Sequence, residues 1–226
     1  MMITAYMGTR DEENNWQQLR RHMVAAQLLP RGIDDARVLQ AMRAVPRHLF
    51  VPPELQADAY EDMPLPIGSA QTISQPYIVA RMTELLHLTA EDSVLEIGTG
   101  SGYQAAVLAR LAQRVFTVEC IPALAQAATE RLRALGVENV EVTPGDGGAG
   151  MPRHAPFATI LVSAAAPRVP PPLLHQLAEG GRLVAPVGSR QRQSLQRWVK
   201  KGRRCRCEKF TLVRFVPLTG KWGVGN

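Results

Sequence analysis

A run of glycines after a short apolar segment is the feature of this sequence best suited to binding chemistry. Residues 94–104 read V-L-E-I-G-T-G-S-G-Y-Q, with Gly98, Gly100 and Gly102 at every second position. Glycine has no Cβ atom and accepts positive φ angles, so the backbone of such a turn can approach a ligand closely. The segment before the turn is predicted to be a buried strand. The segment after it, 105–111, is predicted to be a helix whose first N–H groups favour a carboxylate or a phosphate.

Two classes of nucleotide-type ligand suit a turn of this kind. Dinucleotide enzymes carry G-x-G-x-x-G, with an acid on the next strand that holds the ribose hydroxyls. Here the spacing is G-x-G-x-G, and Glu96 comes two residues before the first glycine. This arrangement resembles motif I of the class I S-adenosylmethionine-dependent methyltransferases, and we favour that interpretation over a dinucleotide enzyme. The turn residues predicted to contact the cofactor are Gly98, Thr99, Gly100, Ser101 and Gly102.

Two further acids end neighbouring predicted strands. Glu119 closes the strand 114–119 and is placed to accept hydrogen bonds from ribose hydroxyls. Asp146 is followed by Gly147, after the predicted strand 139–143, at the carboxyl edge where ligands bind in open α/β sheets. Asp146 could accept a hydrogen bond from an adenine amino group. The alternative is a simple turn aspartate, because Asp-Gly favours turns.

The segment T-I-S-Q-P is a second candidate site. Ser74 is a good helix N-cap, and Pro76 suits the first turn of a helix that runs to about Leu86. Thr72 and Ser74 then lie beside free backbone amides, an arrangement of hydroxyl and N–H donors that could hold an anion. Capping by Ser74 alone is the plainer interpretation.

The rest of the chain alternates between predicted strands and helices. An amphipathic helix is expected over 16–28, and a second helix follows a cap at Asp34 or Asp35. After a proline-rich loop at 46–68, further helices and strands are predicted at 121–135, 159–163, 171–177, 181–187, 195–199 and 209–216.

This order predicts a Rossmann-like, doubly wound α/β fold. The mostly parallel sheet has helices on both faces, an N-terminal helical cap and an antiparallel C-terminal edge. We expect residues 1–15 to be a flexible extension and 16–226 to be a single methyltransferase domain. Within it, 16–68 would form the cap and loop, and 69–226 the cofactor-binding sheet domain.

Composition excludes several classes of protein. The chain has 226 residues, of which 46% are hydrophobic, and no apolar run approaches the ~20 residues that span a bilayer. Residues 1–15 carry acids where a secretory signal has basic residues, and the three cysteines have no disulfide-framework or zinc-site spacing. We therefore expect a cytoplasmic protein, without a membrane partner or a bound metal.

The formal charge of +6 is concentrated near the C-terminus. Between Arg190 and Lys209 there are nine basic residues and one acid, Glu208. Such a run could attract nucleic acid or an acidic protein surface. We favour a solvated hairpin, because no interleaved aromatic residues or nucleic-acid motif accompany the run.

Several segments together resemble one family, from about Trp16 to Leu218. The segment 64–86, P-L-P-I-G-S-A-Q-T-I-S-Q-P-Y-I-V-A-R-M-T-E-L-L, is similar to the signature of the protein-L-isoaspartate O-methyltransferases. The glycine turn, G-D-G at 145–147, G-G-R-L-V-A-P-V-G at 180–188 and V-R-F-V-P-L at 213–218 match the same family in the same order. Segment 64–86 is much more specific than the glycine turn, because methyltransferases in general lack it.

The resemblance implies an activity and roles for residues. Such an enzyme transfers a methyl group from S-adenosylmethionine to the free α-carboxylate of an L-isoaspartyl residue in damaged proteins and peptides, which would be its partners. Ser74 corresponds to the family's catalytic position, with Thr72 beside it. Glu96, the glycine turn, Glu119 and the Asp146 turn correspond to cofactor contacts. The residues implied to bind substrate are Ile73, Gln75, Val213, Phe215 and Val216.

Two positions depart from the family's pattern. Ala158 follows A-P-F where the family usually has an aspartate, so activity could be reduced. Gly148 stands where a bulky aromatic residue often follows G-D-G, which predicts a looser adenine pocket. The alternatives to an isoaspartyl repair enzyme are a methyltransferase for another acceptor, a protein that binds the cofactor without turnover, and a nucleic-acid-binding module. We expect a monomer.

Overall fold

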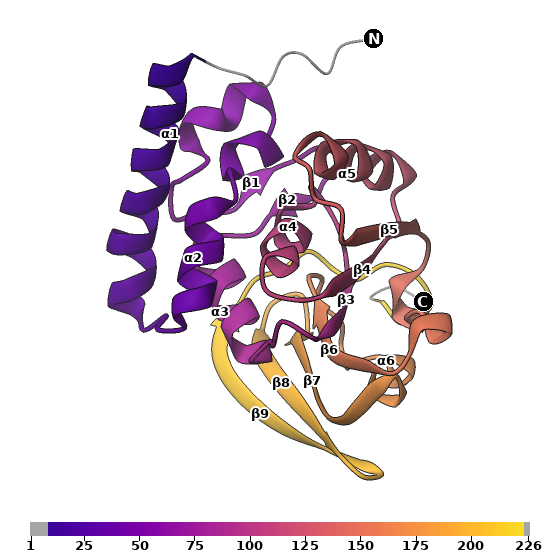
Figure 1. Cartoon of the computed structure of the whole chain (residues 1–226). Coiled ribbons are helices and arrows are strands. Elements are labelled where there is room, and N and C mark those ends of the chain that lie inside the picture. The colour runs from indigo at the N-terminus through magenta and orange to yellow at the C-terminus, as the bar shows by residue number, and fades with distance from the viewer. Residues whose placement is uncertain (1–8, 224–226) are drawn as a thin grey trace.

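The computed structural model describes residues 9–223, and a twisted sheet forms its centre (Figure 1). Among the described residues, this central sheet has seven strands in the order β5-β4-β3-β6-β7-β8-β9. Neighbours from β5 to β7 pair in parallel, and β8 and β9 add an antiparallel edge. The strands are β3 (Ser93–Ile97), β4 (Arg114–Glu119), β5 (Val140–Pro144), β6 (Phe157–Val162), β7 (Leu177–Gly188), β8 (Gln193–Lys201) and β9 (Arg204–Val213). The predicted fold class is confirmed.

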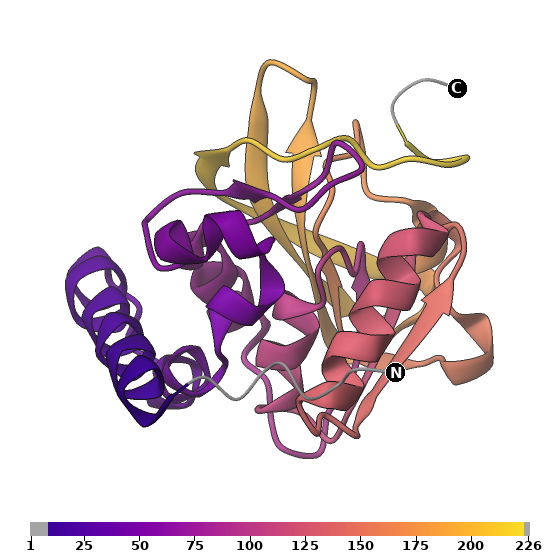
Figure 2. The ribbon, with the colours of Figure 1, turned by 90° about the horizontal axis from the view of Figure 1, so that it is seen from above.

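Helices cover this sheet and extend from one side of it (Figures 1 and 2). They are α1 (Arg10–Met23), α2 (Ala36–Ala44), α3 (Pro76–Leu86), α4 (Tyr103–Ala109), α5 (Pro122–Ala134) and α6 (Pro171–His175). A short ribbon of β1 (Leu65–Pro66) and β2 (Thr72–Ile73) interrupts the proline-rich loop. Within residues 9–223, none of the helices combines the length and apolar character needed to cross a membrane.

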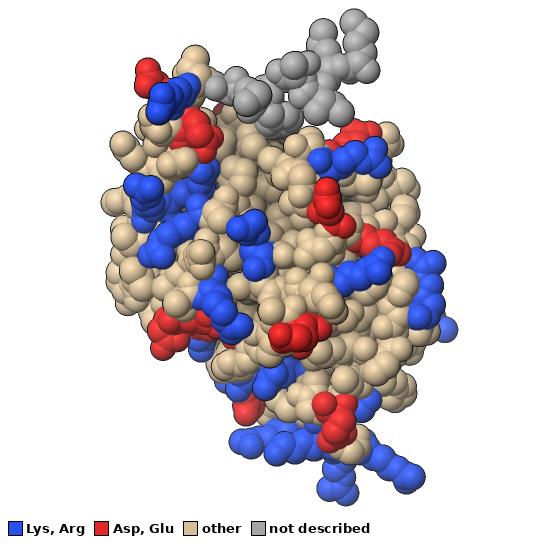
Figure 3. Space-filling view, in the orientation of Figure 1, with Lys and Arg blue, Asp and Glu red and all other residues tan. Residues whose placement is uncertain are grey.

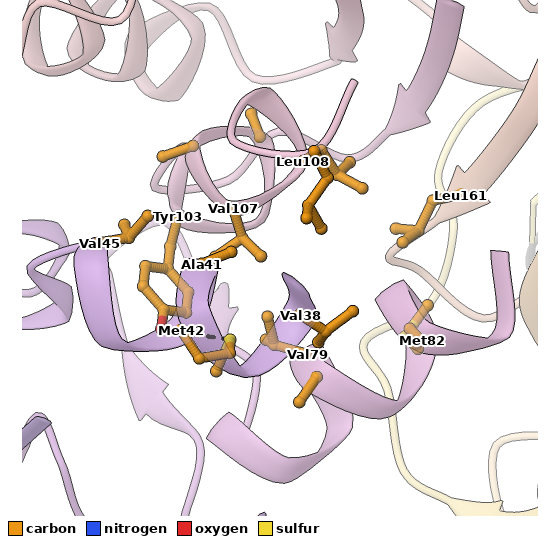
Figure 4. Close-up of a cluster of buried hydrophobic side chains, with 14 of the residues drawn as sticks. Val38, Ala41, Met42, Val45, Val79, Met82, Tyr103, Val107, Leu108 and Leu161 are labelled. Atoms are coloured by element: carbon orange, nitrogen blue, oxygen red, sulfur yellow. Dashed lines mark hydrogen bonds between the residues drawn. The ribbon is translucent and has the colours of Figure 1, made fainter. Parts of the chain in front are cut away.

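Alternating side chains of the strands build one core on each face of the sheet. On the first face, strand residues such as Val115 and Leu161 pack with α2, α3 and α4. Figure 4 shows part of this core, in which Met42 of α2 and Met82 of α3 lie with residues of α4. On the second face, residues that include Leu95, Phe116 and Ile160 pack with a buried leucine of α6 and with Leu218. Helical residues therefore bury both faces, as a mostly parallel sheet requires.

The first helix begins earlier than its apolar stripe indicates. The Thr9 hydroxyl accepts a hydrogen bond from the Glu12 amide at 3.3 Å, and the Thr9 amide donates to Glu12 Oε2 at 2.7 Å. This reciprocal capping box starts α1 at Arg10, inside the stretch 1–15 that was expected to be an extension. Residues 1–8 lie outside the described part of the chain.

The start of α3 corrects one expectation. The N-cap position is occupied by Gln75 and not by Ser74, and the cap makes no side-chain hydrogen bond. Pro76 is the first helical residue, where its missing N–H costs nothing, and it fixes the start one residue later than a Ser74 cap requires. The Ser74 hydroxyl is therefore not used to cap α3.

Candidate active site

The candidate site lies at the carboxyl edge of the sheet, where the strand order reverses. β3 lies between β4 and β6, so the chain leaves β3 toward one side and later returns on the other. Ligands bind at such a switch point in open α/β sheets. The loops after β3 and β6 are joined there by a hydrogen bond from the Ser163 amide to the Ile97 carbonyl, at 2.8 Å.

The glycine turn connects β3 to α4 with three left-handed residues. Gly98, Gly100 and Gly102 have φ angles of 92°, 54° and 88°. A Cβ atom at Gly102 would be in ordinary contact with the side chains of Ala128 and Leu132 of α5, so its positive φ, and not lack of space, is what favours glycine there. The predicted strand, turn and helix are present, although α4 begins at Tyr103 and not at residue 105.

Glu119 holds the turn from the neighbouring strand. Its Oε2 accepts a hydrogen bond from the Gly100 amide at 2.8 Å, and its Oε1 accepts from the Ile121 amide at 3.0 Å. The side chain is almost fully buried and borders the cleft in front of the turn. A carboxylate oxygen has two lone pairs, so Glu119 keeps acceptor capacity for hydroxyl groups of a ligand.

Glu96 lies beneath the turn instead of in the cleft. It has no exposed surface, and its Oε2 accepts a hydrogen bond from the Thr117 hydroxyl at 2.6 Å. The Thr117 hydroxyl also lies 2.7 Å from that of Thr99, so the three side chains form a chain that supports the turn from below. Burial raises the pKa of Glu96 to about 8, with the Glu119 charge adding to the increase and the Thr117 hydrogen bond opposing it.

The turn after β5 approaches the end of β3 closely. A Cβ atom at Gly147 would lie 2.5 Å from Ile97 Cγ2, so no side chain fits at position 147. Asp146 caps the following turn through a hydrogen bond from the Gly148 amide to Oδ1 at 2.9 Å. Its Oδ2 accepts a second hydrogen bond, from the Lys221 amide, at 3.0 Å. Gly147 lines the cleft, whereas Asp146 does not.

A first cleft opens in front of the glycine turn and has about 860 Å³ of empty space, partly open to solvent. Among its described lining residues, Glu119 is the only one with a charged side chain. The hydroxyls of Thr99 and Ser101 and apolar side chains such as Val79 and Met82 complete the lining. An acidic, otherwise neutral cleft with glycine walls fits S-adenosylmethionine, which carries a ribose and a cationic sulfonium group.

A second cleft adjoins the first. Among its described lining residues, Arg214 is the only one with a charged side chain, so this cleft is basic where the first is acidic. The two clefts share four residues, which are Thr72, Ser74, Ser163 and Val216. A cation in the first cleft and an anion in the second would therefore meet near these four residues.

The structure brings most of the sequence-predicted site residues together. The first cleft is lined by Thr72, Ile73, Ser74, Gly98, Thr99, Gly100, Ser101, Glu119, Gly147 and Val216. The second adds Gln75, Val213 and Phe215. Three of the predicted cofactor contacts line neither cleft, namely Glu96, Gly102 and Asp146.

Several lining residues were not identified from the sequence. They include Ser163, Ala164, Gln191, Leu218 and Thr219. The first two directly follow β6, so the rule that ligands bind where strand order reverses could have located them. The others follow β7 or β9; of these, Leu218 ends the family-like segment 213–218, and no local pattern marks Gln191 or Thr219.

Ala158 lies away from the candidate site. It is the second residue of β6, at the amino end of the strand, and Ser163 follows the carboxyl end. Five residues of extended chain separate the two by roughly 16 Å. Ala158 also lines neither cleft.

Comparison with known proteins is consistent with this geometry. The model of the protein-L-isoaspartate(D-aspartate) O-methyltransferase family matches residues 19–223. A protein-L-isoaspartate O-methyltransferase of Methanoregula boonei is 59% identical over 207 residues, which cover 92% of this chain and 95% of the relative. A protein-L-isoaspartate O-methyltransferase of Syntrophobacter fumaroxidans is 56% identical over 209 residues, covering 92% of this chain and 98% of the relative.

Solved structures share the fold. A protein-L-isoaspartate O-methyltransferase superposes with a TM-score of 0.82 at 30% identity, over 90% of this chain and 67% of the other. A structure from Plasmodium falciparum in complex with S-adenosyl-L-homocysteine superposes with a TM-score of 0.76 at 24% identity, over 88% of this chain and 98% of the other. The similarity to the second structure concerns the fold alone.

Proposed function

Because the chain belongs to the protein-L-isoaspartate O-methyltransferase family, we propose that its two adjoining clefts hold the two reactants of that family's reaction. The chain is an S-adenosylmethionine-dependent methyltransferase that acts on L-isoaspartyl residues of damaged proteins. The first cleft, beside Glu119, holds the cofactor, and the second, beside Arg214, holds the isoaspartyl peptide. The observation that carries this assignment is the opposite charge of two clefts that share Ser74.

The reaction depends more on the placement of the carboxylate and the methyl group than on proton transfer. A carboxyl group with a pKa near ~4 is already ionised at neutral pH, so no general base is required. When bound, S-adenosylmethionine supplies a methyl group on a positively charged sulfur. The protein must hold the carboxylate in line with that methyl group and exclude water. Partial negative and positive charges then neutralise each other as the bond forms, which a weakly polar site favours.

Ser74 is proposed as the residue that positions the acceptor carboxylate. Its hydroxyl is not used to cap α3, and its side chain borders both clefts. A neutral donor can orient a carboxylate without binding it as tightly as a guanidinium would, so the attacking oxygen stays reactive. Thr72 is exposed, lies two residues before Ser74 and borders the same two clefts, and it is proposed to donate to the second carboxylate oxygen.

The cofactor contacts are proposed on the same basis. The glycine turn and Gly147 would lie against the cofactor, Glu119 would accept its ribose hydroxyls and Asp146 its adenine amino group. Glu96, which is fully buried, would act by holding Thr117 and thereby the turn. Ile73, Gln75, Val213, Phe215 and Val216 are proposed to contact the peptide.

Three properties of the whole chain are also proposed. One core joins α2 to α3, α4 and the sheet, which supports a single domain over 16–226. The large apolar side chains exposed in the described residues, Leu29, Met63 and Leu212, are few, which supports a monomer. All three cysteines are free thiols, which supports a location in the reducing cytoplasm. Light scattering of the purified protein would test the oligomeric state.

Transfer of labelled methyl groups to an isoaspartyl peptide tests the assignment of Ser74. The matching normal aspartyl peptide serves as the acceptor control. We expect base-labile label on the isoaspartyl peptide alone, and Ser74→Ala should lower kcat about 10- to 100-fold, because a misplaced carboxylate loses in-line alignment. Affinity for S-adenosylmethionine, measured by calorimetry, should change less than threefold.

Ser93→Ala is the matched control, because Ser93 opens β3 at the opposite edge of the sheet. It should retain full activity. Equal activity of the Ser74 and Ser93 variants would refute the positioning role. Equal labelling of both peptides would refute the isoaspartyl acceptor.

A further inference from the structure

The segment after β9 crosses the carboxyl edge of the sheet. We call residues 216–223 the C-terminal strap. In Figure 2 the yellow chain after β9 runs across the molecule beside the purple β1–β2 ribbon. The strap pairs with the loop after β6, where the Ala165 amide donates to the Val216 carbonyl at 2.8 Å and the Leu218 amide donates to the Ala165 carbonyl at 2.7 Å.

The strap then continues over the ends of β4 and β5. The Thr219 hydroxyl lies 2.9 Å from the thiol of Cys120, which follows β4. The Lys221 amide donates to Asp146 Oδ2, which follows β5. Residues 216–219 of the strap line the first cleft. Its last part contacts Asp146, the residue proposed to bind the adenine.

Trp222 occupies the space beside Gly148. A Cβ atom at position 148 would lie 2.7 Å from Trp222 Cδ1 and 3.1 Å from Trp222 Cβ. A side chain at position 148 and the indole in its present position therefore exclude each other. The sequence predicted a looser adenine pocket because position 148 has no side chain, but an aromatic ring from the strap fills that volume.

We propose that Trp222 forms the wall at the adenine end of the cofactor site, in place of the side chain that Gly148 lacks. This inference rests on the proposed function, in which Asp146 and Gly147 hold the adenine. An indole provides a large, rigid apolar surface against which a base can pack. Asp146 Oδ1 accepts a hydrogen bond from the Gly148 amide and Oδ2 accepts one from the Lys221 amide, and a carboxylate oxygen can accept two.

The role proposed for Trp222 is to position the cofactor, so it predicts a separation of kinetic constants. Trp222→Ala should raise the Kd for S-adenosylmethionine and for S-adenosylhomocysteine about tenfold, as loss of aromatic packing on a base does. KM for S-adenosylmethionine should rise by a similar factor. The kcat at saturating cofactor should stay within twofold, because the reacting groups meet near Ser74, at the other end of the cleft.

Calorimetry with four variants tests this inference. Trp222→Phe should recover most of the affinity, because a smaller aromatic ring still forms a wall. The double variant Gly148→Trp with Trp222→Ala should also recover affinity, because the aromatic ring returns from the other side of the same space. Lys221→Ala is the matched control, since it keeps the backbone amide that binds Asp146 and should leave Kd unchanged.

The melting temperature without ligand distinguishes a role of Trp222 in the cofactor site from a purely structural role in the strap. A fall in melting temperature for Trp222→Ala with an unchanged Kd would overturn the inference, as would tighter cofactor binding. Failure of the double variant to bind better than Trp222→Ala would also overturn it. The unmodified chain is assayed in parallel, so failure of that chain to methylate an isoaspartyl peptide would count against the proposed function and not against the strap.

Discussion

At the scale of single residues, the fully buried carboxyl group of Glu96 is an unusual component of a binding site. Burial raises its pKa to about 8, so the group is protonated at neutral pH and donates or accepts hydrogen bonds without a charge. If Glu96 were charged, its carboxylate would be repelled by that of Glu119. The described contacts of Glu96 include no counterion. Its protonation therefore leaves Glu119 as the charged group of the cofactor cleft.

The raised pKa of Glu96 predicts a pH dependence of stability. The unfolded chain loses this proton near pH 4.5, while the folded chain keeps it until about pH 8. The folded state therefore binds more protons between these values, and its stability falls as pH rises through that window. Glu96→Gln, which has no proton to lose, should melt at a higher temperature than the unmodified chain at pH 8 and at a similar temperature at pH 5.

Thermal melting from pH 5 to pH 9 would measure this difference. A constant offset between the two melting curves across that range would show that Glu96 does not titrate as described. The cofactor Kd at pH 7 should change less than threefold in the glutamine variant, since both side chains accept the Thr117 hydrogen bond.

At the scale of elements, Glu84 connects the N-terminal cap to the sheet. It lies in α3 and is 6% exposed, and its Oε1 accepts hydrogen bonds from the amides of Asp34 and Asp35 at 2.8 and 3.1 Å. Asp35 in turn caps α2 through the amides of Arg37 and Val38. One buried carboxylate therefore fixes where α2 begins relative to α3.

Glu84→Ala should lower the free energy of unfolding by about 2 kcal/mol, because it leaves two part-buried amides without their acceptor. Arg81→Ala is the matched control. It removes the ion pair with Glu84 at 2.6 Å but keeps the carboxylate, and a partly exposed pair contributes less than about 1 kcal/mol. Denaturant unfolding of both variants measures the difference, and equal losses would contradict the role of Glu84.

At the scale of the whole molecule, one cluster of positive charge lies away from the candidate site. Blue side chains gather at the lower end of the molecule in Figure 3, over the turn between β8 and β9. This basic tip contains Lys200, Lys201, Arg203 and Arg204. β8 starts at Gln193 near the second cleft and ends at the tip eight residues later, about 27 Å away. At physiological ionic strength the Debye length is about 8 Å, so the tip is screened from the cleft.

Replacing Lys201, Arg203 and Arg204 by glutamine should therefore leave methyl transfer to an uncharged isoaspartyl peptide within twofold of the original rate. Retention on a polyanion column should weaken, because the same charges dominate that surface. A salt series at fixed peptide concentration provides the measurement. A large loss of transfer to the uncharged peptide would show that the tip takes part in the reaction.

The sequence by itself determined the order of strands and helices, the glycine turn and the segment T-I-S-Q-P. These features depend on neighbours along the chain: periodicity sets the burial of each strand, and glycine spacing sets the turn. The strand 114–119 was predicted with the residues it has in the structure. The family signature at 64–86 extended this information to function, since Ser74 and Thr72 lie within it.

Only the tertiary structure decided which distant segments share a site. Ser74, Ser163 and Val216 meet at the junction of two clefts because the strand order reverses between β3 and β6. The burial of Glu96 and the position of Trp222 beside Gly148 likewise depend on packing between segments far apart in the chain. Local sequence patterns do not predict such contacts, because the energy of each contact depends on the space left by residues elsewhere in the sequence.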